Sequence, residues 1–194
     1  LSVCDRNLEL MNRKKNKARH NLLAEVCMAA KYEAQSLINY RAQYDAKYKD
    51  YGSTICTVLA RSFADIGDII RGKDLYLGYD DEEKKRREKL EDNLKKIFGI
   101  IYGKLKDAQN HYSDTTDYYQ LREDWWTANR HTVWKALTCS KELDNSSYFR
   151  LTCVTGQGPS VANHYCRCND DKPNADKPYT DPPTYFDYVP QYLR

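Results

Sequence analysis

The sequence of 194 residues predicts a mainly α fold: a helical bundle tied by disulfides, with long loops and little or no sheet. Apolar residues recur at steps of three and four along several stretches, which is the spacing of one face of an α-helix. All six prolines follow residue 158, so the preceding chain lacks the residue that breaks helix interiors. Cys27 and Cys56 each lie within such an apolar stripe. Disulfides between core helices indicate an oxidising location, which excludes most classes of cytosolic enzyme.

Four helices are expected in chain order. They cover residues 21–38, 54–71, 81–108 and 115–138. Asn21 suits the N-cap of the first helix, and the second helix is expected to stop near Gly72. The third helix opens with Asp80 and three further acidic residues, which complement the positive end of the helix dipole. Gly99 and Gly103 weaken this helix, each by about 1 kcal/mol relative to alanine.

The segments between and after these helices are expected to be less regular. Residues 39–53 are polar and read as a long connector, and residues 148–153 have extended character but are too few for a sheet. Four tyrosines recur along the connector and could line one side of it: Tyr40, Tyr44, Tyr48 and Tyr51. In the fourth helix the spacing of Trp126 and Trp134 favours the core over sugar stacking, with Trp125 less clearly placed.

The composition excludes several classes of function. The net charge of +3 is small for a nucleic-acid-binding domain, so no nucleic-acid partner is expected. No apolar run approaches the roughly 20 residues that cross a bilayer. No signal peptide is visible, so the chain beginning at Leu1 is expected to be a fragment. The sequence has no P-loop, no Gly-x-Ser-x-Gly and no His-Glu-x-x-His pattern, so we expect no enzyme, no catalytic residue and no cofactor.

The cysteines are candidates for structural disulfides. They are Cys4, Cys27, Cys56, Cys139, Cys153, Cys166 and Cys168. Two pairings stay open, Cys27 with Cys56 and Cys56 with Cys139, because spacing alone does not decide connectivity. The odd number leaves one cysteine over, whose partner is expected beyond Arg194, with a free buried thiol as the alternative. Residues 164–168 contain metal-ligand residue types but no usual zinc spacing, so no metal site is expected.

Two groups of basic residues are candidate sites for polyanions. The first group precedes the first helix and consists of Arg13, Lys14, Lys15, Lys17 and Arg19. The second group shares the outer face of the third helix and consists of Lys85, Lys89 and Lys96. Sulfated glycans are polyanions that such groups attract with release of counterions. A solvated loop explains the first group equally well. Because Glu88 and Asp92 lie near the second group, a salt-bridged solvent face is its commoner explanation.

A pair of carboxylates on the second helix is the remaining candidate for chemistry. Asp65 and Asp68 are three residues apart, which is a spacing that acid–base chemistry can use. Arg61 and Arg71 each lie within helical reach of one of them. Structural ion pairing is therefore expected.

Several blocks of the sequence, taken in order, resemble one known family. They are residues 4–9, 21–33, 59–69 (Leu-Ala-Arg-Ser-Phe-Ala-Asp-Ile-Gly-Asp-Ile), 71–78, 121–130 (Leu-Arg-Glu-Asp-Trp-Trp-Thr-Ala-Asn-Arg), 133–139 and 185–194 (Tyr-Phe-Asp-Tyr-Val-Pro-Gln-Tyr-Leu-Arg). The chain resembles a Duffy-binding-like domain of the alpha class, which forms the head of the variant erythrocyte membrane protein of Plasmodium falciparum. The resemblance covers nearly the whole chain.

The resemblance implies one domain fragment: residues 1–20 as the remnant of a first subdomain, residues 21–138 as the helical core, and residues 139–194 as a segment rich in cysteine and proline. The third subdomain of the family is expected to be absent from this fragment. The resemblance also implies an adhesin on the extracellular face of the infected erythrocyte membrane. Alpha-class domains are associated with rosetting, in which uninfected erythrocytes are bound through sulfated glycans such as heparan sulfate, blood-group sugars or complement receptor.

The sequence therefore predicts a non-catalytic adhesin domain whose two basic groups bind a host erythrocyte receptor. Antibodies are a further class of partner. Two alternatives stay open: a protein receptor bound through variable loops with no glycan role, and an architectural head domain that positions its neighbour.

Overall fold

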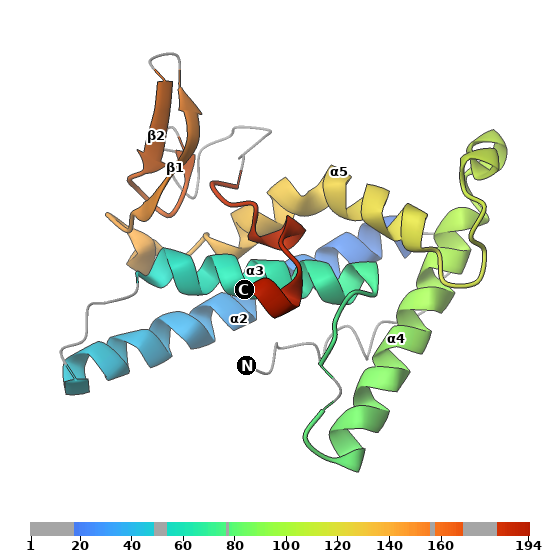
Figure 1. Ribbon diagram of the computed structural model, residues 1–194, viewed down its shortest axis with the longest axis horizontal. Coiled ribbons are helices and arrows are strands. Elements are labelled where there is room, and N and C mark those ends of the chain that lie inside the picture. The colour runs from blue at the N-terminus through green and yellow to red at the C-terminus, as the bar shows by residue number, and fades with distance from the viewer. Residues whose placement is uncertain (1–17, 49–53, 77, 156–157, 169–181) are drawn as a thin grey trace.

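The computed structural model describes residues 18–48, 54–76, 78–155, 158–168 and 182–194, and within them the fold is mainly helical, as predicted (Figure 1). The long helices are α2 (Ala18–Tyr48), α3 (Ile55–Arg71), α4 (Asp81–Tyr102) and α5 (Tyr119–Leu137). The strands β1 (Tyr148–Thr155) and β2 (Gly158–Ala162) pair antiparallel in a two-stranded sheet. Short 3-10 helices are η1 (Lys106–His111), η2 (Lys141–Leu143), η4 (Phe186–Tyr188) and η5 (Gln191–Leu193).

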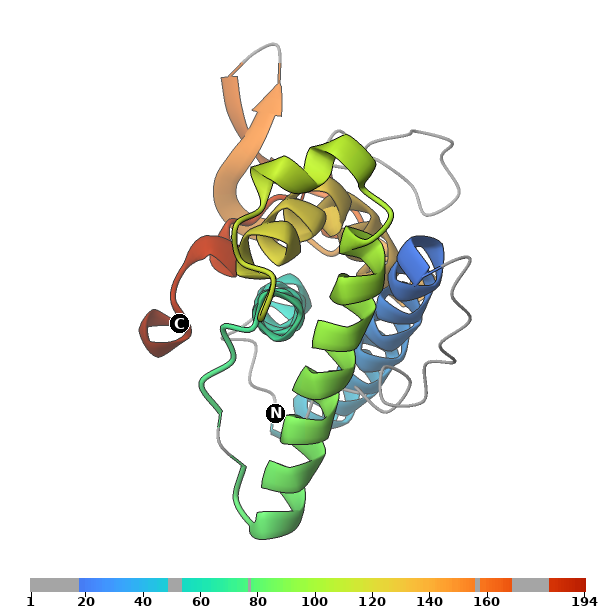
Figure 2. The same ribbon diagram turned by 90° about the vertical axis from the view of Figure 1, so that its right-hand side faces the viewer.

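The core forms around α3, which Figure 2 shows end-on among α2, α4 and α5. Its apolar stripe is buried as the three-and-four spacing predicts, and Phe63 at its middle is fully buried. The Phe63 ring lies 5.1 Å from the Trp126 ring and 5.2 Å from the Trp134 ring, measured between centroids. Trp125 is also buried and meets Phe98 of α4 edge to face. All three tryptophans therefore belong to the core.

The ends of α3 and the start of α4 follow their predicted signals. Thr54 caps α3 by accepting the backbone N–H of Thr57, and Gly72 ends it with a left-handed φ of 71°. At the start of α4 the Asp80 side chain accepts the backbone N–H of Glu83 at 2.8 Å. These groups satisfy backbone donors and acceptors that a helix terminus leaves without partners.

The predicted connector at residues 39–53 is wrong for its first ten residues, because α2 continues to Tyr48. No proline or glycine interrupts this stretch. Arg41 pairs with Asp45 one turn later, and the Tyr40 and Tyr44 rings stack. Tyr40 is exposed and Tyr44 half-buried. The side chain of Tyr48 and the whole of Tyr51 lie outside the described residues.

Three other helix ends differ from the sequence prediction. The N-cap expected at Asn21 is wrong, since α2 begins at Ala18. The third helix ends at Tyr102 instead of 108, next to Gly103, and the chain turns into η1. The fourth begins at Tyr119 instead of 115, because the Asp114 side chain accepts three backbone N–H groups of residues 116–119 and holds them in a turn.

Both predicted disulfide pairings are wrong. Cys56 bonds to Cys166, and Cys153 bonds to Cys168, while Cys27 and Cys139 are free thiols. Because Cys166 and Cys168 are both oxidised, neither offers a thiolate to a metal. Cys4 lies outside the described residues.

The fold explains why Cys166 is the partner of Cys56. The buried guanidinium of Arg167 donates to the Thr138 hydroxyl and to the Lys135 carbonyl, at the end of α5. This places the turn at residues 164–168 against the first turn of α3. Cys27 lies elsewhere, with its Sγ 3.9 Å from the Thr132 carbonyl oxygen of α5, and burial raises the pKa of this thiol to about 11.

The C-terminal segment at residues 182–194 is held on α3 and α5 by buried charges. Asp187 is 1% exposed and accepts two hydrogen bonds from Arg130, at 2.7 and 2.8 Å, and one from the Trp126 indole N–H at 2.9 Å. Its carbonyl oxygen accepts from the buried Arg71. No helix in the described part of the chain is both long and apolar enough to cross a membrane.

Candidate functional site

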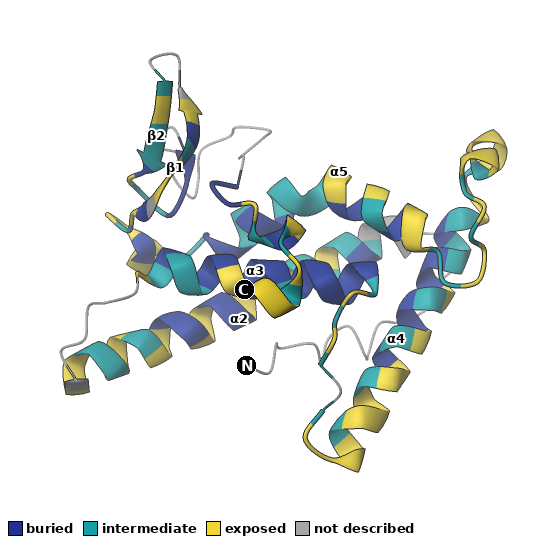
Figure 3. Cartoon of the chain, in the orientation of Figure 1, coloured by how far each residue is buried: buried dark blue, intermediate teal, exposed yellow. Residues whose placement is uncertain are grey.

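The outer face of α4 carries the only predicted basic group whose side chains the structure describes. Lys85, Lys89 and Lys96 are all exposed, opposite the buried stripe that begins at Leu90. The helical rise of 1.5 Å per residue spreads these three lysines over about 16 Å. Figure 3 shows that the first turns of α4 are largely exposed, and Figure 1 shows them projecting from the bundle.

Within the part of the chain that the structure describes, these lysines form no ion pairs with the acidic residues beside them. Glu88 and Asp92 are exposed on the same face, but among the described residues neither forms an ion pair with Lys85, Lys89 or Lys96. The salt-bridged face that was the commoner sequence explanation therefore does not form there. Asp81 and Glu82 in the first turn of α4 are also exposed, so the face carries charges of both signs.

The other basic group cannot be placed. Arg13, Lys14, Lys15 and Lys17 lie outside the described residues. Arg19 lies in the first turn of α2, but its side chain is also outside the description. The structure therefore does not bring the two basic groups together.

Three ion pairs fix the side of α4 that faces the bundle. Glu91 accepts both ends of the Arg122 guanidinium, at 2.6 and 2.9 Å. Arg122 is fully buried and also donates to the Ile69 and Ile70 carbonyl oxygens at the end of α3. This one side chain therefore links α3, α4 and α5.

The second and third pairs lie on either side of Glu91. Lys95 lies 2.6 Å from a carboxylate oxygen of Asp117, and this hydrogen bond raises the pKa of Lys95. Arg87 pairs with Asp74 and with Glu83. Because α4 is tied at three points along its length, it presents its lysines in one orientation.

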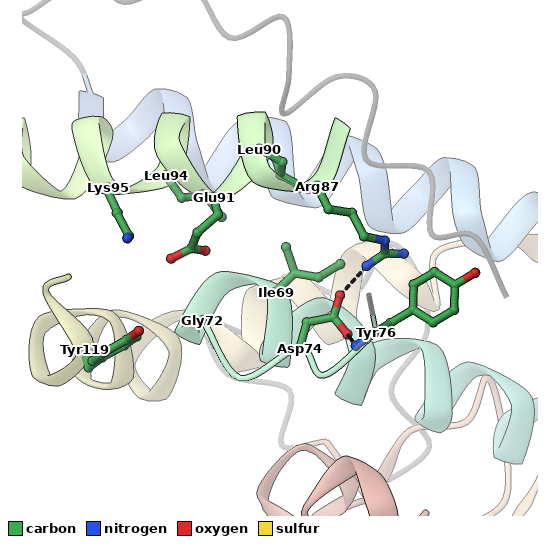
Figure 4. A pocket seen from close by; sticks show the side chains of 10 residues that line it. All are labelled: Ile69, Gly72, Asp74, Tyr76, Arg87, Leu90, Glu91, Leu94, Lys95 and Tyr119. Carbon is green, nitrogen blue, oxygen red and sulfur yellow. Dashed lines mark hydrogen bonds and ion pairs between the residues drawn. The ribbon is translucent and has the colours of Figure 1, made fainter. Parts of the chain in front are cut away.

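A pocket of about 210 Å³ lies between these pairs, at the junction of α3, α4 and α5 (Figure 4). Apolar side chains and Gly72 line its inner part, and tyrosines and paired charges surround it. The lining residues are Ile69, Gly72, Asp74, Tyr76, Arg87, Leu90, Glu91, Leu94, Lys95 and Tyr119. Sequence reasoning did not find this pocket, because its residues come from three separate stretches and none has a motif.

The acidic pair on α3 is structural, as predicted, but only one of its partners is the expected one. Asp68 pairs with Arg71 at 3.0 Å and also with Arg194. Asp65 pairs with Arg194 at 3.2 Å, whereas Arg61 is exposed and does not reach it. Burial raises the pKa of Asp65 to about 6, against the lowering effect of Arg194. Both carboxylates serve to hold the C-terminal residue.

Comparison with known proteins places the chain among adhesion domains. The family model described as the Duffy binding domain matches residues 1–194. The structure is similar to the NTS-DBL1α domain of membrane protein 1 (PfEMP1) from the varO strain of Plasmodium falciparum, with 39% identity and a TM-score of 0.73. It is also similar to the NTS-DBL1α and CIDRγ double domain of the same strain, with 39% identity and a TM-score of 0.70.

A third similar structure is a DBLβ domain of PfEMP1 bound to human ICAM-1, with 32% identity and a TM-score of 0.54. The three matches cover 98%, 98% and 90% of this chain. The chain spans 39%, 25% and 30% of the length of those structures. The comparison with curated proteins gave no match.

Proposed function

The chain belongs to the Duffy binding domain family, as a Duffy-binding-like domain of PfEMP1, and we propose that it binds sulfated glycans of the erythrocyte surface through the exposed lysines of α4. The observation that carries the proposal is that Lys85, Lys89 and Lys96 share one exposed face without ion pairs to the described residues. On this proposal the domain is a non-catalytic adhesin at the outer face of the infected erythrocyte, active in rosetting.

The mechanism is electrostatic capture. A heparan-sulfate-like chain carries closely spaced negative charges with condensed counterions, and each lysine that meets a sulfate releases some of them. Three lysines over about 16 Å of helix contact several sugar units in an extended chain. The ion pairs of Arg87, Glu91 and Lys95 hold α4 in place, so the helix itself needs no ordering when the glycan binds. The basic group before α2 is a second proposed contact for the same chain.

The first test reverses the charge of the α4 face. The triple variant Lys85→Glu, Lys89→Glu and Lys96→Glu should elute from heparin at lower salt than the unchanged domain. The slope of the logarithm of the binding constant against the logarithm of the salt concentration should become shallower by roughly 2 to 3. The reason is that three contacts between a lysine and a sulfate are lost. A control with the same charge change at dispersed exposed lysines should elute almost unchanged. Its sites are Lys31, Lys106 and Lys141.

A second triple variant addresses the group before α2. Charge reversal at Lys14, Lys15 and Lys17 should abolish retention if this group also contacts the glycan. Unchanged elution salt in both triple variants would refute capture by these lysines and arginines.

A protein receptor is the second candidate function. The DBLβ structure bound to ICAM-1 shows that a similar domain recognises a protein. Salt dependence separates the two functions. The affinity for a polyanion should fall steeply from roughly 50 to 500 mM salt, because surface charges become screened over this range. Erythrocyte binding that persists at high salt would favour a protein receptor. A domain that binds neither erythrocytes nor heparin would favour an architectural role.

A further inference from the structure

The segment that leads into α4 carries an exposed tyrosine. Tyr79 has 91% of its surface exposed, more than any other large apolar or aromatic side chain in the described part of the chain. Its ring meets the Tyr76 ring edge to face, with 5.3 Å between the centroids. The Tyr79 side chain is therefore open to an enzyme that approaches from solvent.

The backbone around Tyr79 is not part of a helix or a strand. Gly78 before it has a left-handed φ of 86°, and Asp80 after it is extended, with φ −140° and ψ 172°. Tyr79 lies at the end of the bundle from which the first turns of α4 project (Figures 1 and 3). Such a segment fits into an enzyme cleft without opening the core, because local opening costs least where few buried contacts hold the chain.

Acidic side chains follow Tyr79 directly. Asp80, Asp81 and Glu82 are all exposed. Asp80 caps α4, whereas Asp81 and Glu82 form no ion pair with any residue that the structure describes. Carboxylates beside an exposed phenol therefore remain available to a basic protein surface. Charge patterns of this kind are one of the features by which kinases select their substrates.

We propose that Tyr79 is a phosphorylation site for a tyrosine kinase whose substrate-binding surface is basic. The phenol oxygen of Tyr79 attacks the γ-phosphorus of ATP, the bond from this phosphorus to the bridging oxygen breaks, and ADP leaves. The phenol proton passes to the catalytic aspartate of the kinase. Basic side chains of the kinase pair with Asp81 and Glu82 and so position the hydroxyl for transfer.

Two other tyrosines show that exposure alone does not make this site. Tyr192 is 75% exposed and Tyr40 is 67% exposed. Neither has an acidic residue within three positions along the chain on either side. They are internal controls, since the same kinase meets all three tyrosines on one folded molecule.

The phosphate changes the charge near the lysine face of α4. A phosphotyrosine carries a charge of about −1.5 to −2 at pH 7. Lys85 follows Tyr79 by six residues, which is about 9 Å at the rise of a helix and comparable to the Debye length at physiological salt. The phosphate therefore weakens the attraction of a polyanion to this face. This consequence rests on the proposed function, whereas the modification itself does not.

The test treats the folded domain with ATP, Mg²⁺ and the catalytic domain of a tyrosine kinase that prefers acidic flanks. Phosphate is located by peptide mass spectrometry. We expect Tyr79 to be modified at least roughly tenfold faster than Tyr40 or Tyr192. No phosphate at Tyr79, or equal rates at the three tyrosines, would overturn the proposal.

A variant of the acidic residues tests their role in recognition. The triple variant Asp80→Asn, Asp81→Asn and Glu82→Gln should slow modification of Tyr79 by roughly tenfold or more, while asparagine at position 80 keeps the helix cap. A matched control removes three exposed carboxylates elsewhere and should leave the rate unchanged. Its substitutions are Glu88→Gln, Asp92→Asn and Asp107→Asn. Equal rates in the two triple variants would refute recognition through the acidic residues.

Heparin elution then separates this proposal from the proposed function. The phosphorylated domain should elute at lower salt than the unmodified domain, and elution at the same salt would refute the effect on the lysine face. A domain that is phosphorylated at Tyr79 but never binds heparin would refute glycan capture and support the modification site.

Discussion

Replacing Asp187 by alanine tests how the C-terminal segment is held on the core. In the folded protein this carboxylate is 1% exposed and bonds to Arg130 and to the Trp126 indole N–H. In Asp187→Ala the Arg130 guanidinium, whose side chain is 13% exposed, loses its carboxylate partner. The N–H of the fully buried Trp126 indole loses its acceptor. Removing one partner of a buried ion pair costs about 3–5 kcal/mol.

The expected change is large against the total stability of the domain. Native domains are stable by about 5–15 kcal/mol. Each 1 kcal/mol corresponds to about 2–4 °C in Tm for a chain of this size, so Asp187→Ala should lower Tm by about 10 °C. The assay is thermal and urea unfolding followed by the fluorescence of the three core tryptophans, of which Trp126 lies at the altered site.

Two comparisons show whether the carboxylate itself is responsible. Asp92→Ala removes an exposed carboxylate on α4 and should change stability by less than about 0.5 kcal/mol. The double variant Asp187→Ala with Arg130→Met removes the unpaired charge and should recover part of the loss. A Tm lowered by less than about 3 °C in Asp187→Ala, or no recovery in the double variant, would refute the reasoning.

Three further predictions address the cysteines and the half-buried Asp65 on α3. Replacing Cys56 and Cys166 by alanine opens a link across 110 residues and should cost about 4–5 kcal/mol in urea unfolding; a cost below about 1 kcal/mol would contradict a role in stability. Asp65 has a pKa of about 6 in the folded protein, above its ordinary value, so its stabilising contribution is present below pH about 4 and is lost as pH rises through 6. Asp65→Asn should therefore flatten the stability curve between these pH values, which pH-dependent unfolding measures. Burial raises the pKa of Cys27 to about 11, so iodoacetamide should label it at pH 8 at least tenfold more slowly in the folded than in the unfolded chain, as judged by peptide mass spectrometry.

Local signals in the sequence determined most helix positions. The spacing of the α3 stripe predicted its buried face, and Asp80 and Gly72 predicted a start and an end that the structure confirms. The error at residues 39–48 arose because this stretch is polar, and polarity was taken for a connector. A helix beyond the core needs no apolar stripe when pairs one turn apart, such as Arg41 with Asp45, support it.

Of the two candidate sites, the lysine face was predicted from the sequence and the pocket was not. The sharing of one face by Lys85, Lys89 and Lys96 follows from helical periodicity, so the sequence predicted it. That these lysines are without ion pairs to the described residues was not predictable, because Glu88 and Asp92 are close enough in sequence to reach them. The pocket beside α4 was also not predictable, since Tyr119 and Gly72 meet only after three helices have packed.

The sequence by itself determined the helical class, the buried stripes and the family, because these depend on residues that are neighbours along the chain. Tertiary structure alone decided that Cys56 bonds to Cys166, that Asp65 pairs with Arg194, and where the C-terminal segment lies. These contacts join residues more than 100 positions apart, where no local spacing reports distance. They depend on where the turn at residues 164–168 and the C-terminal segment at residues 182–194 lie against α3. Those positions depend on the packing of the whole core.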